Sequence, residues 1–403
     1  MVPELHVREF RALIEAERGV FIAMARDIWE HPEVGFQERY AAEYHVRLLK
    51  RFGFRVTFPY LGLDTAYRAE WGEGRPAFAM AAEYDALPGI GHACGHNLIG
   101  TAALAAAYAV KRALERDGAA GRVVVLGTPA EEGGSGKVLL ERQGCLNDID
   151  AAMMVHPSWR STTDNGCLAC QRVEVEFRGK AAHAAVSPEK GINALDAMLQ
   201  LFASIAAWRQ HIPESARVHG VIVEGGARPN IIPDHTRAAL YLRAAQPDVM
   251  DAMRARFRAL VEGACLATGC THTLKFLDDA TDARQPNPAL NAHYKASMEA
   301  LGLPVVVPSA EGRGSTDFGN FSTRRPGIHA YFAIADRETA AHSVEMAQAA
   351  NSDLGRENTL TAAAAMADVA WSFLTQPAFR ESVLAAFVPP GAHRGVNSAP
   401  QKP

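Results

Sequence analysis

The sequence predicts an α/β fold: a doubly wound sheet with helices on both faces, interrupted by a small α+β domain. Three apolar runs, at residues 77–82, 122–127 and 151–155, alternate with helical patterns, as buried parallel strands do. Each run leads directly into polar residues, and ligands bind at the carboxyl edge of such sheets. From about residue 172 the strands instead alternate charged and apolar residues, which is typical of half-exposed strands.

The first part of the larger domain is expected to comprise residues 1–171. Apolar residues at helical spacing predict a helix over residues 4–30, ended by His31-Pro32, and a second over 41–52, stopped by Gly53. The other elements expected here are strands at 54–58, 65–71 and 77–82, a helix at 98–115, and strands at 122–127 and 151–155.

The inserted α+β domain is expected to span residues 172–283. Its strands are predicted at 173–177, 217–223, 236–243 and 271–277, and its helices at 191–208 and 247–268. The larger domain then resumes over residues 284–387, with a helix at 288–301, a Gly-rich turn at 312–319, a strand at 327–334 and a closing helix at 359–373. Residues 388–403, rich in Pro, Gly and Ser, are expected to form a disordered tail.

The composition argues against several classes of partner. The net charge is −4, so no basic field indicates nucleic acid or an anionic membrane surface. No run is long and apolar enough to span a bilayer, and the N-terminus lacks a secretory core. Six irregularly spaced cysteines form no disulfide framework, so a cytoplasmic protein with reduced thiols is expected. Cys167 and Cys170 could form a redox pair or half a zinc site, but structural thiols are expected there.

Cys94 and His96 are the first candidates for chemistry. We expect them on an extended loop with both side chains on the same side, where a thiolate and an imidazole suit zinc or a related transition metal. Gly91 and Gly95 allow a tight turn beside them. The alternative is a buried cysteine beside a structural histidine.

Glu131 and Glu132 follow the strand at 122–127 and precede two glycines. One carboxylate is expected to bind a metal and the other to act as general base for a bound water, with its pKa raised toward neutrality. A solvated pair of surface carboxylates is the alternative.

Two further histidines lie at loop positions: His156 ends a strand and His342 lies in a late loop. Either one alone could be structural. With Cys94, His96 and Glu132 they make five possible ligands, more than one closed tetrahedral site holds. A two-metal centre bridged by Cys94 is therefore predicted.

Together these residues resemble the metal-dependent amidohydrolases of the aminoacylase/carboxypeptidase clan. The resemblance is greatest to the branch with p-aminobenzoyl-glutamate hydrolase, the indole-acetyl-amino-acid hydrolases and the aminoacylase-like dipeptidases. It runs in order from about Trp29 to His342 and rests on EYDALPGIGH (83–92), GHACGHN (91–97), EEGG (131–134), GKAAHAA (179–185), NIIP (230–233) and STDFGN (315–320).

The resemblance implies a metallopeptidase-type catalytic domain interrupted by a lid and dimerisation domain, hence a homodimer or a higher oligomer. It implies two divalent ions, zinc or manganese with cobalt or nickel as further options. The implied roles are metal ligation by Cys94, His96, Glu132, His156 and His342, general base catalysis by Glu131, polarisation of the scissile carbonyl by His183, binding of the substrate carboxylate by Asn230 and Arg243, and support of the metal site by Asp85. Many relatives have Asp where this chain has Asn97, which implies a change in the charge around the metals.

Without the resemblance, the patterns around His183, Asn230 and Arg243 indicate an exposed histidine, a turn residue and a strand-end cation. The segment Gly134-Ser135-Gly136-Lys137 differs from a phosphate loop, because Glu131 replaces the leading Gly and Val138 the Ser/Thr. Nucleotide binding is therefore not expected.

The expected function is hydrolysis of a dipeptide or N-acyl amino acid. A metal-bound water, deprotonated by Glu131, attacks the amide carbonyl, and a free amino acid leaves. A substrate of the p-aminobenzoyl-glutamate kind is the first alternative. An inactive metal-bound binding subunit and a structural zinc protein are alternatives from other classes.

Overall fold

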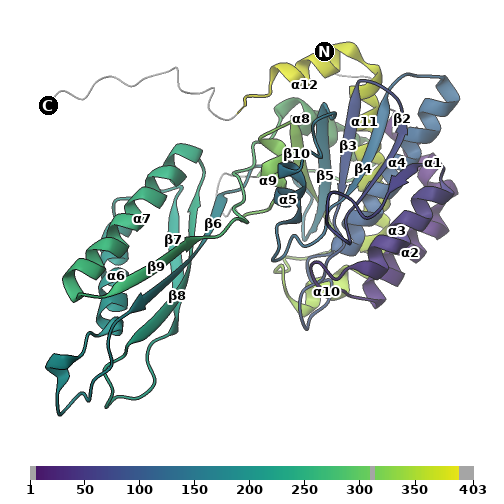
Figure 1. Ribbon diagram of the computed structural model, residues 1–403. Helices are drawn as coiled ribbons and strands as arrows, with labels where there is room; N and C mark the ends of the chain where they lie inside the picture. Colours follow the sequence, from purple (N-terminus) through teal and green to yellow (C-terminus); the bar gives the residue numbers. More distant parts are fainter. Residues whose placement is uncertain (1–5, 309–313, 390–403) are drawn as a thin grey trace, which may run out of the picture. The chain divides into compact units, whose positions relative to one another are not determined.

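The computed structural model describes residues 6–308 and 314–389 (Figure 1). The chain divides into two compact units, Met1–Gly166 with Arg284–Pro403, and Cys167–Ala283. Residues 4–5 of the first expected helix, 312–313 of the expected Gly-rich turn and 390–403 of the expected tail lie outside the described residues. Among the described helices, none combines the length and apolar character that crossing a membrane requires.

The larger unit is built on a six-stranded sheet in the order β1-β2-β4-β3-β5-β10, in which β3, β4, β5 and β10 run parallel. The strands are β1 (Arg55–Thr57), β2 (Tyr67–Gly72), β3 (Ala77–Ala82), β4 (Arg122–Gly127), β5 (Ala151–Ser158) and β10 (Gly327–Ala333). The helices are α1 (Val7–Ala16), α2 (Arg18–Glu30), α3 (Arg39–Arg51), α4 (His96–Asp117), α5 (Gly136–Arg142), α8 (Pro288–Ala300), α9 (Phe318–Ser322), α10 (Val344–Ala349), α11 (Asp353–Thr375) and α12 (Pro377–Ala385).

Both faces of this sheet are covered, as the apolar strands predicted. Every residue of β3 is buried. Phe78 and Met80 belong to the cluster that includes α4 and α11, whereas Ala79 and Ala81 belong to a second cluster with Leu140 of α5. Because neighbouring strand residues point to opposite faces, this division places helices on both sides of the sheet. The doubly wound α/β prediction is confirmed.

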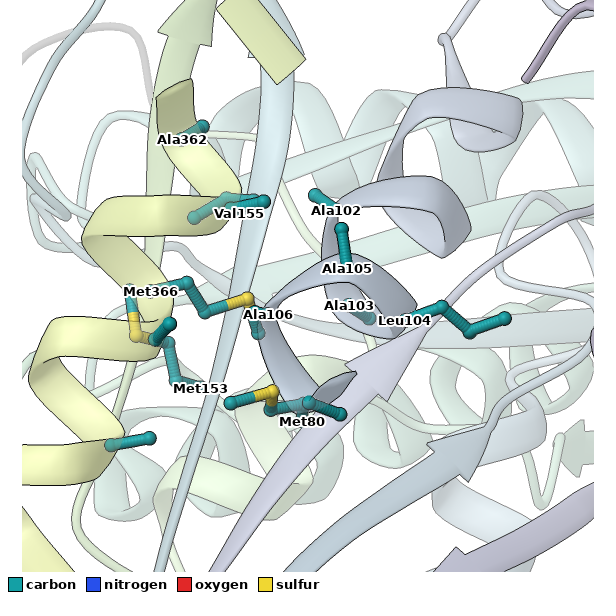
Figure 2. Close-up of a cluster of buried hydrophobic side chains, with 14 of the residues drawn as sticks. Met80, Ala102, Ala103, Leu104, Ala105, Ala106, Met153, Val155, Ala362 and Met366 are labelled. Carbon is teal, nitrogen blue, oxygen red and sulfur yellow. The ribbon is translucent and has the colours of Figure 1, made fainter. Parts of the chain in front are cut away.

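The first face is packed through unusually small side chains. Ala102 and Ala106 of α4 belong to the same buried cluster as Met80 of β3, Met153 of β5 and Met366 of α11 (Figure 2). Alanines let the helices approach one another and the sheet closely, and the flexible methionines fill the remaining space. This packing holds the start of α4, where His96 lies, against the sheet.

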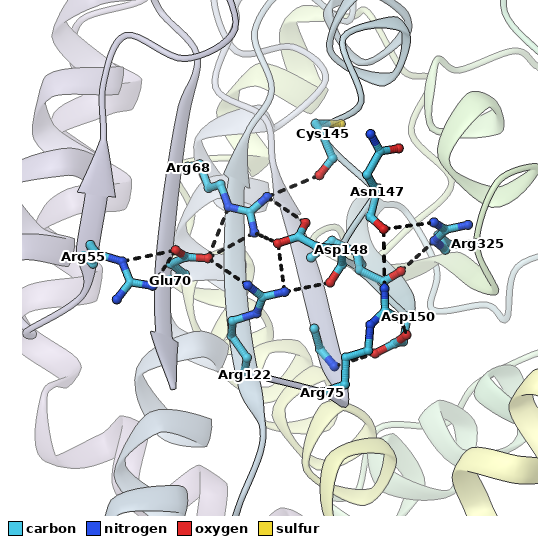
Figure 3. A network of polar contacts seen from close by, with 12 residues as sticks. Arg55, Arg68, Glu70, Arg75, Arg122, Cys145, Asn147, Asp148, Asp150 and Arg325 are labelled. Atoms are coloured by element: carbon cyan, nitrogen blue, oxygen red, sulfur yellow. Dashed lines mark hydrogen bonds and ion pairs between the residues drawn. The ribbon is translucent and has the colours of Figure 1, made fainter. Parts of the chain in front are cut away.

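A polar network lies beside the amino ends of the parallel strands (Figure 3). Asp148 pairs with Arg122 of β4 at 2.9 Å and with Arg68 of β2 at 2.7 Å. Asp150 accepts the backbone N–H of Ala77 at 2.8 Å, so it joins the starts of β5 and β3. The candidate site residues follow the carboxyl ends of these strands, which are the opposite ends.

The smaller unit is an antiparallel four-stranded sheet in the order β7-β8-β6-β9 with helices on one face. Its elements are β6 (Ala169–Arg178), the short 3-10 helix η1 (Pro188–Lys190), α6 (Ala194–Arg209), β7 (Arg217–Glu224), β8 (His235–Ala244), α7 (Pro247–Thr268) and β9 (Thr271–Phe276). Strand β6 alternates buried and half-buried residues, as predicted, but it begins at Ala169 rather than Val173.

The helix predictions differ from the structure in three ways. The helix expected over 4–30 is two helices, because Glu17 leaves helical geometry and Gly19, a poor helix former, follows at once. The helix expected from residue 359 begins at Asp353, since the Ser352 side chain accepts the N–H of Gly355 as a cap. Helices α5, α9, α10 and α12 were not predicted, because each is too short for a clear helical period.

Candidate active site

The candidate site lies where β3, β4 and β5 end. Asp85 follows β3, Glu131 and Glu132 follow β4, and His156 lies near the end of β5. The parallel pairing of these strands brings their carboxyl ends to one edge. Residues that are far apart in the sequence therefore meet in one place.

Cys94 and His96 do not lie on an extended loop, contrary to the sequence-based expectation. Gly95 between them is left-handed, with φ 76°, and His96 is the first residue of α4. A Cβ atom at Gly95 would also lie 2.8 Å from Pro157. Position 95 therefore needs glycine both for its left-handed backbone and for the close contact with Pro157. The turn at Gly95 thus brings the thiol and the imidazole to the same site from a loop and a helix start.

Asp85 ties two candidate ligands together. One carboxylate oxygen lies 2.8 Å from Nδ1 of His96, and the other accepts the backbone N–H of Glu132 at 3.0 Å. Asp85 is 1% exposed, and its pKa is lowered by the neighbouring His96 despite the opposing effect of burial, so the carboxylate stays charged. The Nε2 atom of His96 is left to face the site.

The candidate ligand atoms lie close together. Cys94 Sγ is 3.5 Å from His156 Nε2, and Glu132 Oε1 is 3.3 Å from His342 Nε2 and 3.9 Å from His96 Nε2. Three overlapping groups have all their ligand atoms within 4.8 Å of one another: Cys94 with His96 and His156, Cys94 with Glu132 and His342, and His96 with Glu131 and Glu132. Cys94 belongs to two of these groups.

The site has the chemistry of a metal centre. His96 Nε2 and Glu132 Oε1 are both buried and have no hydrogen-bond partner among the described residues. Buried polar atoms are normally paired, so a missing partner at this position is informative. A thiol, imidazoles and a carboxylate that converge on one point are ligands for a divalent transition metal. The residues therefore fit the metal ions that the motifs implied.

The two later histidines are held by the backbone. His156 Nδ1 lies 2.6 Å from the carbonyl oxygen of Pro157, which leaves Nε2 to face Cys94. Burial lowers the pKa of His156 to about 4, so the ring is neutral, as a metal ligand requires. His342 has a positive φ of 60°, and its N–H donates to the carbonyl of Ala93 at 3.1 Å, so this unusual conformation directs it toward the Cys94 loop.

Glu131 and Cys94 have perturbed acidities. Burial raises the pKa of Glu131 well above its usual range, and the nearby charges of Glu83 and Asp317 raise it further. Burial also raises the pKa of the Cys94 thiol to about 12. A divalent cation bound here would oppose both effects, because it favours the charged forms.

The inserted unit carries the other three implied residues, and it does not bring all three together. His183 and Asn230 are neighbours, because the N–H of Ala184 donates to the carbonyl of Asn230 at 3.0 Å. Arg243 lies near the other end of β8, with its Nε 3.2 Å from His219 Nε2. Arg243 lies eight positions after His235 along β8, a distance of about 26 Å. Within one copy, Asn230 and Arg243 therefore cannot contact the same carboxylate.

Asn97 has a structural position. Its side-chain amide donates to the carbonyls of Ala25 and Ala350 at 3.0 and 3.1 Å, which ties the start of α4 to two other segments. A carboxylate at residue 97 could not donate these hydrogen bonds.

A pocket of about 540 Å³ opens beside the ligands. It is lined by Cys94, His156, Pro157, Ser158, Trp159, Tyr331, Glu338, Thr339, Ala340, Ala341 and Met346. The sequence analysis missed the aromatic and acidic members, Trp159, Tyr331 and Glu338. Trp159 directly follows β5, the strand that carries His156. This position was the one feature of the sequence that could have indicated that Trp159 lines the site.

The comparisons with known proteins agree with this geometry. The family model described as peptidase family M20/M25/M40 matches residues 79–370. The chain is 37% identical over 385 residues to the mouse (Mus musculus) Xaa-Arg dipeptidase, covering 91% of this chain and 88% of that protein. It is 35% identical over 390 residues to a subunit of the p-aminobenzoyl-glutamate hydrolase of Escherichia coli (strain K12), covering 89% of this chain and 80% of that protein.

A solved structure shares the fold. A Bacillus subtilis protein described as a dinuclear metal-binding peptidase of the M20 family superposes with a TM-score of 0.71 at 23% identity, covering 89% of this chain and 99% of the other. The metallopeptidase-type fold that the motifs implied is thereby confirmed. The chain belongs to peptidase family M20/M25/M40 and is an amide-hydrolysing enzyme of that family.

Proposed function

We propose that the protein hydrolyses the amide bond of a dipeptide or a short N-acyl amino acid and releases a free amino acid, with two divalent ions bound. One observation carries the proposal: five side chains of metal-binding type meet at one edge of the sheet with Glu131 beside them. Cys94, His96, Glu132, His156 and His342 would hold the ions. Bound there, the ions would supply Lewis acidity and a more acidic water.

The chain's own groups would move the proton. Glu131 accepts a proton from the attacking water and returns it to the leaving amine. Burial raises the pKa of Glu131, and a bound cation would oppose this shift and favour the carboxylate that can accept the proton. Asp85 fixes the His96 ring and the Glu132 backbone, so both ligands keep their orientation. The mixed sulfur, nitrogen and oxygen donors suit zinc or manganese, with cobalt or nickel as further options.

We infer that two copies of the chain share the substrate-binding residues. Because Asn230 and Arg243 lie far apart in one copy, a carboxylate held by both needs residues from two subunits. His183, which adjoins Asn230, would then reach the scissile carbonyl from the same subunit as Asn230. This arrangement implies a homodimer formed through the inserted domain. Sedimentation of the purified protein, together with mixing of inactive Glu131 and His183 variants, tests it: restored activity in the mixture supports sharing.

The substrate would carry a free carboxylate, and we propose a cationic side chain as well. The mouse relative is an Xaa-Arg dipeptidase. In this chain, Glu338, Trp159 and Tyr331 line the pocket beside Cys94. A carboxylate and aromatic faces both attract a guanidinium or ammonium group. The E. coli relative supports an aryl-acyl glutamate as the second candidate.

The decisive experiment is a hydrolysis panel. Apoprotein is supplemented with zinc, manganese, cobalt or nickel and mixed with dipeptides ending in Arg or Lys, neutral dipeptides, N-acetyl amino acids and p-aminobenzoyl-glutamate, and released amino acid is measured. Metal-dependent release from the dipeptides supports the proposal. Full activity after exhaustive chelation would contradict it. Binding of these compounds without release of an amino acid would favour a binding subunit. Bound metal without either binding or hydrolysis of these compounds would favour a structural zinc protein.

We also propose that the protein works in the cytoplasm with its thiols reduced. None of the six cysteines forms a disulfide in the described structure, and Cys167 and Cys170 are not joined to each other. Fractionation of the cells that produce it would test this location.

A further inference from the structure

A fully buried ion cluster lies behind the candidate metal ligands. We call it the Lys137 triad; it consists of Lys137, Glu83 and Asp317. Lys137 Nζ lies 2.5 Å from Glu83 Oε1 and 2.7 Å from Asp317 Oδ1, and all three side chains are completely buried. The backbone N–H of Lys137 also donates to Asp317 Oδ2 at 2.9 Å. The triad therefore joins the end of β3, the start of α5 and the residue before α9.

A charged group this deep in the protein requires a reason, because taking charges out of water is costly unless they are paired with good geometry. The pairing here is complete on the Lys137 side, where the ammonium contacts two carboxylates. It is incomplete on the Glu83 side. Glu83 Oε2 is buried and has no hydrogen-bond partner among the described residues.

The second oxygen of Glu83 is directed at the metal site. It lies 3.4 Å from His96 Nε2, which also has no hydrogen-bond partner within the described part of the chain. Asp85 lies on the other side of the same ring, at Nδ1. His96 is thus held between two carboxylates, of which one is fixed by the Glu132 backbone and the other by Lys137.

The triad also adjoins the turn that carries Glu131 and Glu132. Asp85 holds the turn at the Glu132 N–H, and Lys137 lies just beyond its end, in the first turn of α5. A Cβ at Gly136 would lie 1.9 Å from the Pro129 carbonyl oxygen, so the chain between the two anchors is tightly packed. Lys137 is therefore linked to the metal site in two ways, through Glu83 and through the turn.

We propose that Lys137 is a positioning residue of the active centre, which holds the Glu83 carboxylate beside the metal-facing nitrogen of His96 and anchors the Glu131–Glu132 turn. Lys137 does not contact the substrate; it acts through Glu83, and Asp317 keeps its ammonium group in place. The role differs from that of a metal ligand, because the ammonium group cannot bind a cation. This inference rests on the proposed metal centre.

The test measures manganese binding to chelated apoprotein by titration calorimetry, with no substrate present. The proteins compared are the wild type, Lys137→Met, Glu83→Gln and the double variant. Glu83 lies beside the metal-facing nitrogen of His96, so its carboxylate would favour a cation bound there. We expect each single variant to bind manganese about 10- to 100-fold more weakly, the size of loss typical for residues that support a metal site. Because Lys137 acts through Glu83, the double variant should lose no more manganese affinity than the single variant that binds manganese more weakly. Multiplying losses would show that the two residues act separately and would overturn the proposal.

Two controls separate this role from stability alone. Lys111→Met removes another largely buried lysine, paired with Glu115 at 2.5 Å on α4, and should leave manganese binding unchanged. If Lys137→Met fails to fold, Lys137→Met with Asp317→Asn removes one of the carboxylates left unpaired. That folded variant should still bind manganese about 10-fold or more weakly.

Wild-type affinity in a folded Lys137 variant would overturn this inference but leave the metal centre standing. A wild-type apoprotein that binds no divalent ion would overturn both, so the two failures are distinguishable.

Discussion

The carboxylate of Asp85 lies 2.8 Å from Nδ1 of His96, and both side chains are buried. A carboxylate in this position fixes the tautomer of the imidazole and its rotation, so Nε2 is the nitrogen presented to the metal site. Because the second oxygen of Asp85 binds the Glu132 backbone, one side chain orients two candidate ligands.

Asp85→Asn should therefore weaken metal binding about 10- to 100-fold, since an amide accepts hydrogen bonds at its oxygen only and its NH2 group would face one of the two donors. Manganese titration of the apoprotein measures the effect. Asp148→Asn is the matched control, because Asp148 lies in the arginine network beside the amino ends of the strands. It should change stability and leave metal affinity alone; equal metal losses in both variants would contradict the prediction.

Glu131→Gln should retain bound metal and lose about 10²- to 10⁴-fold in kcat, because the amide cannot accept the proton of the attacking water. Elemental analysis and steady-state kinetics measure the two quantities on the same sample. Glu132→Gln is the comparison, since it should lower metal content. A Glu131→Gln enzyme with wild-type turnover would end the general-base assignment.

Cys94→Ala should lower the metal content of the purified protein, because Cys94 belongs to two of the three ligand groups. Elemental analysis under identical loading conditions gives the metal-to-protein ratio. Cys145→Ala removes a thiol that is fully buried in the apolar core and should keep the full ratio. An unchanged ratio in Cys94→Ala would refute its role as a bridging ligand.

His45 should make the fold sensitive to acid. It is fully buried, with Nδ1 2.9 Å from the Tyr67 hydroxyl, and burial lowers its pKa to about 3. The folded pKa lies below the unfolded value of about 6.5, so the stabilisation is complete above pH 6.5 and declines as the pH falls toward 3. At pH 5 the loss from this residue is about 2 kcal/mol.

Denaturant unfolding at pH 7.5 and pH 5 measures this effect in the wild type and in His45→Gln. The difference between the two pH values should be smaller in the variant by about 2 kcal/mol. Identical pH dependence in His45→Gln and the wild type would refute the assignment.

Glu338→Gln should lower kcat/KM about tenfold for dipeptides with a C-terminal Arg or Lys, which corresponds to about 1.4 kcal/mol of lost interaction. Neutral dipeptides should be unaffected, because they lack the cation that Glu338 would contact. Asp336→Asn is the control, because it removes a nearby exposed carboxylate that does not line the pocket. An equal loss for neutral and cationic substrates would show that Glu338 does not select charge.

The sequence by itself determined the architecture and the family. The apolar runs at β3, β4 and β5 could be recognised locally, because a strand buried on both faces has no polar side to hide. Likewise, the Cys94–His96 and Glu131–Glu132 motifs are short and consecutive, so residue type and spacing alone indicated metal chemistry. Short helices such as α5 were missed, because seven residues cannot display a helical period.

Only the tertiary structure decided how separate residues act on one another. The left-handed Gly95 turned an expected loop into a helix start, since φ depends on the packing against Pro157. The pairing of Lys137 with Glu83 and Asp317 joins residues up to 180 positions apart, which no local pattern reveals. The separation of Asn230 from Arg243 likewise follows from the direction of β8, because a strand carries its two ends apart.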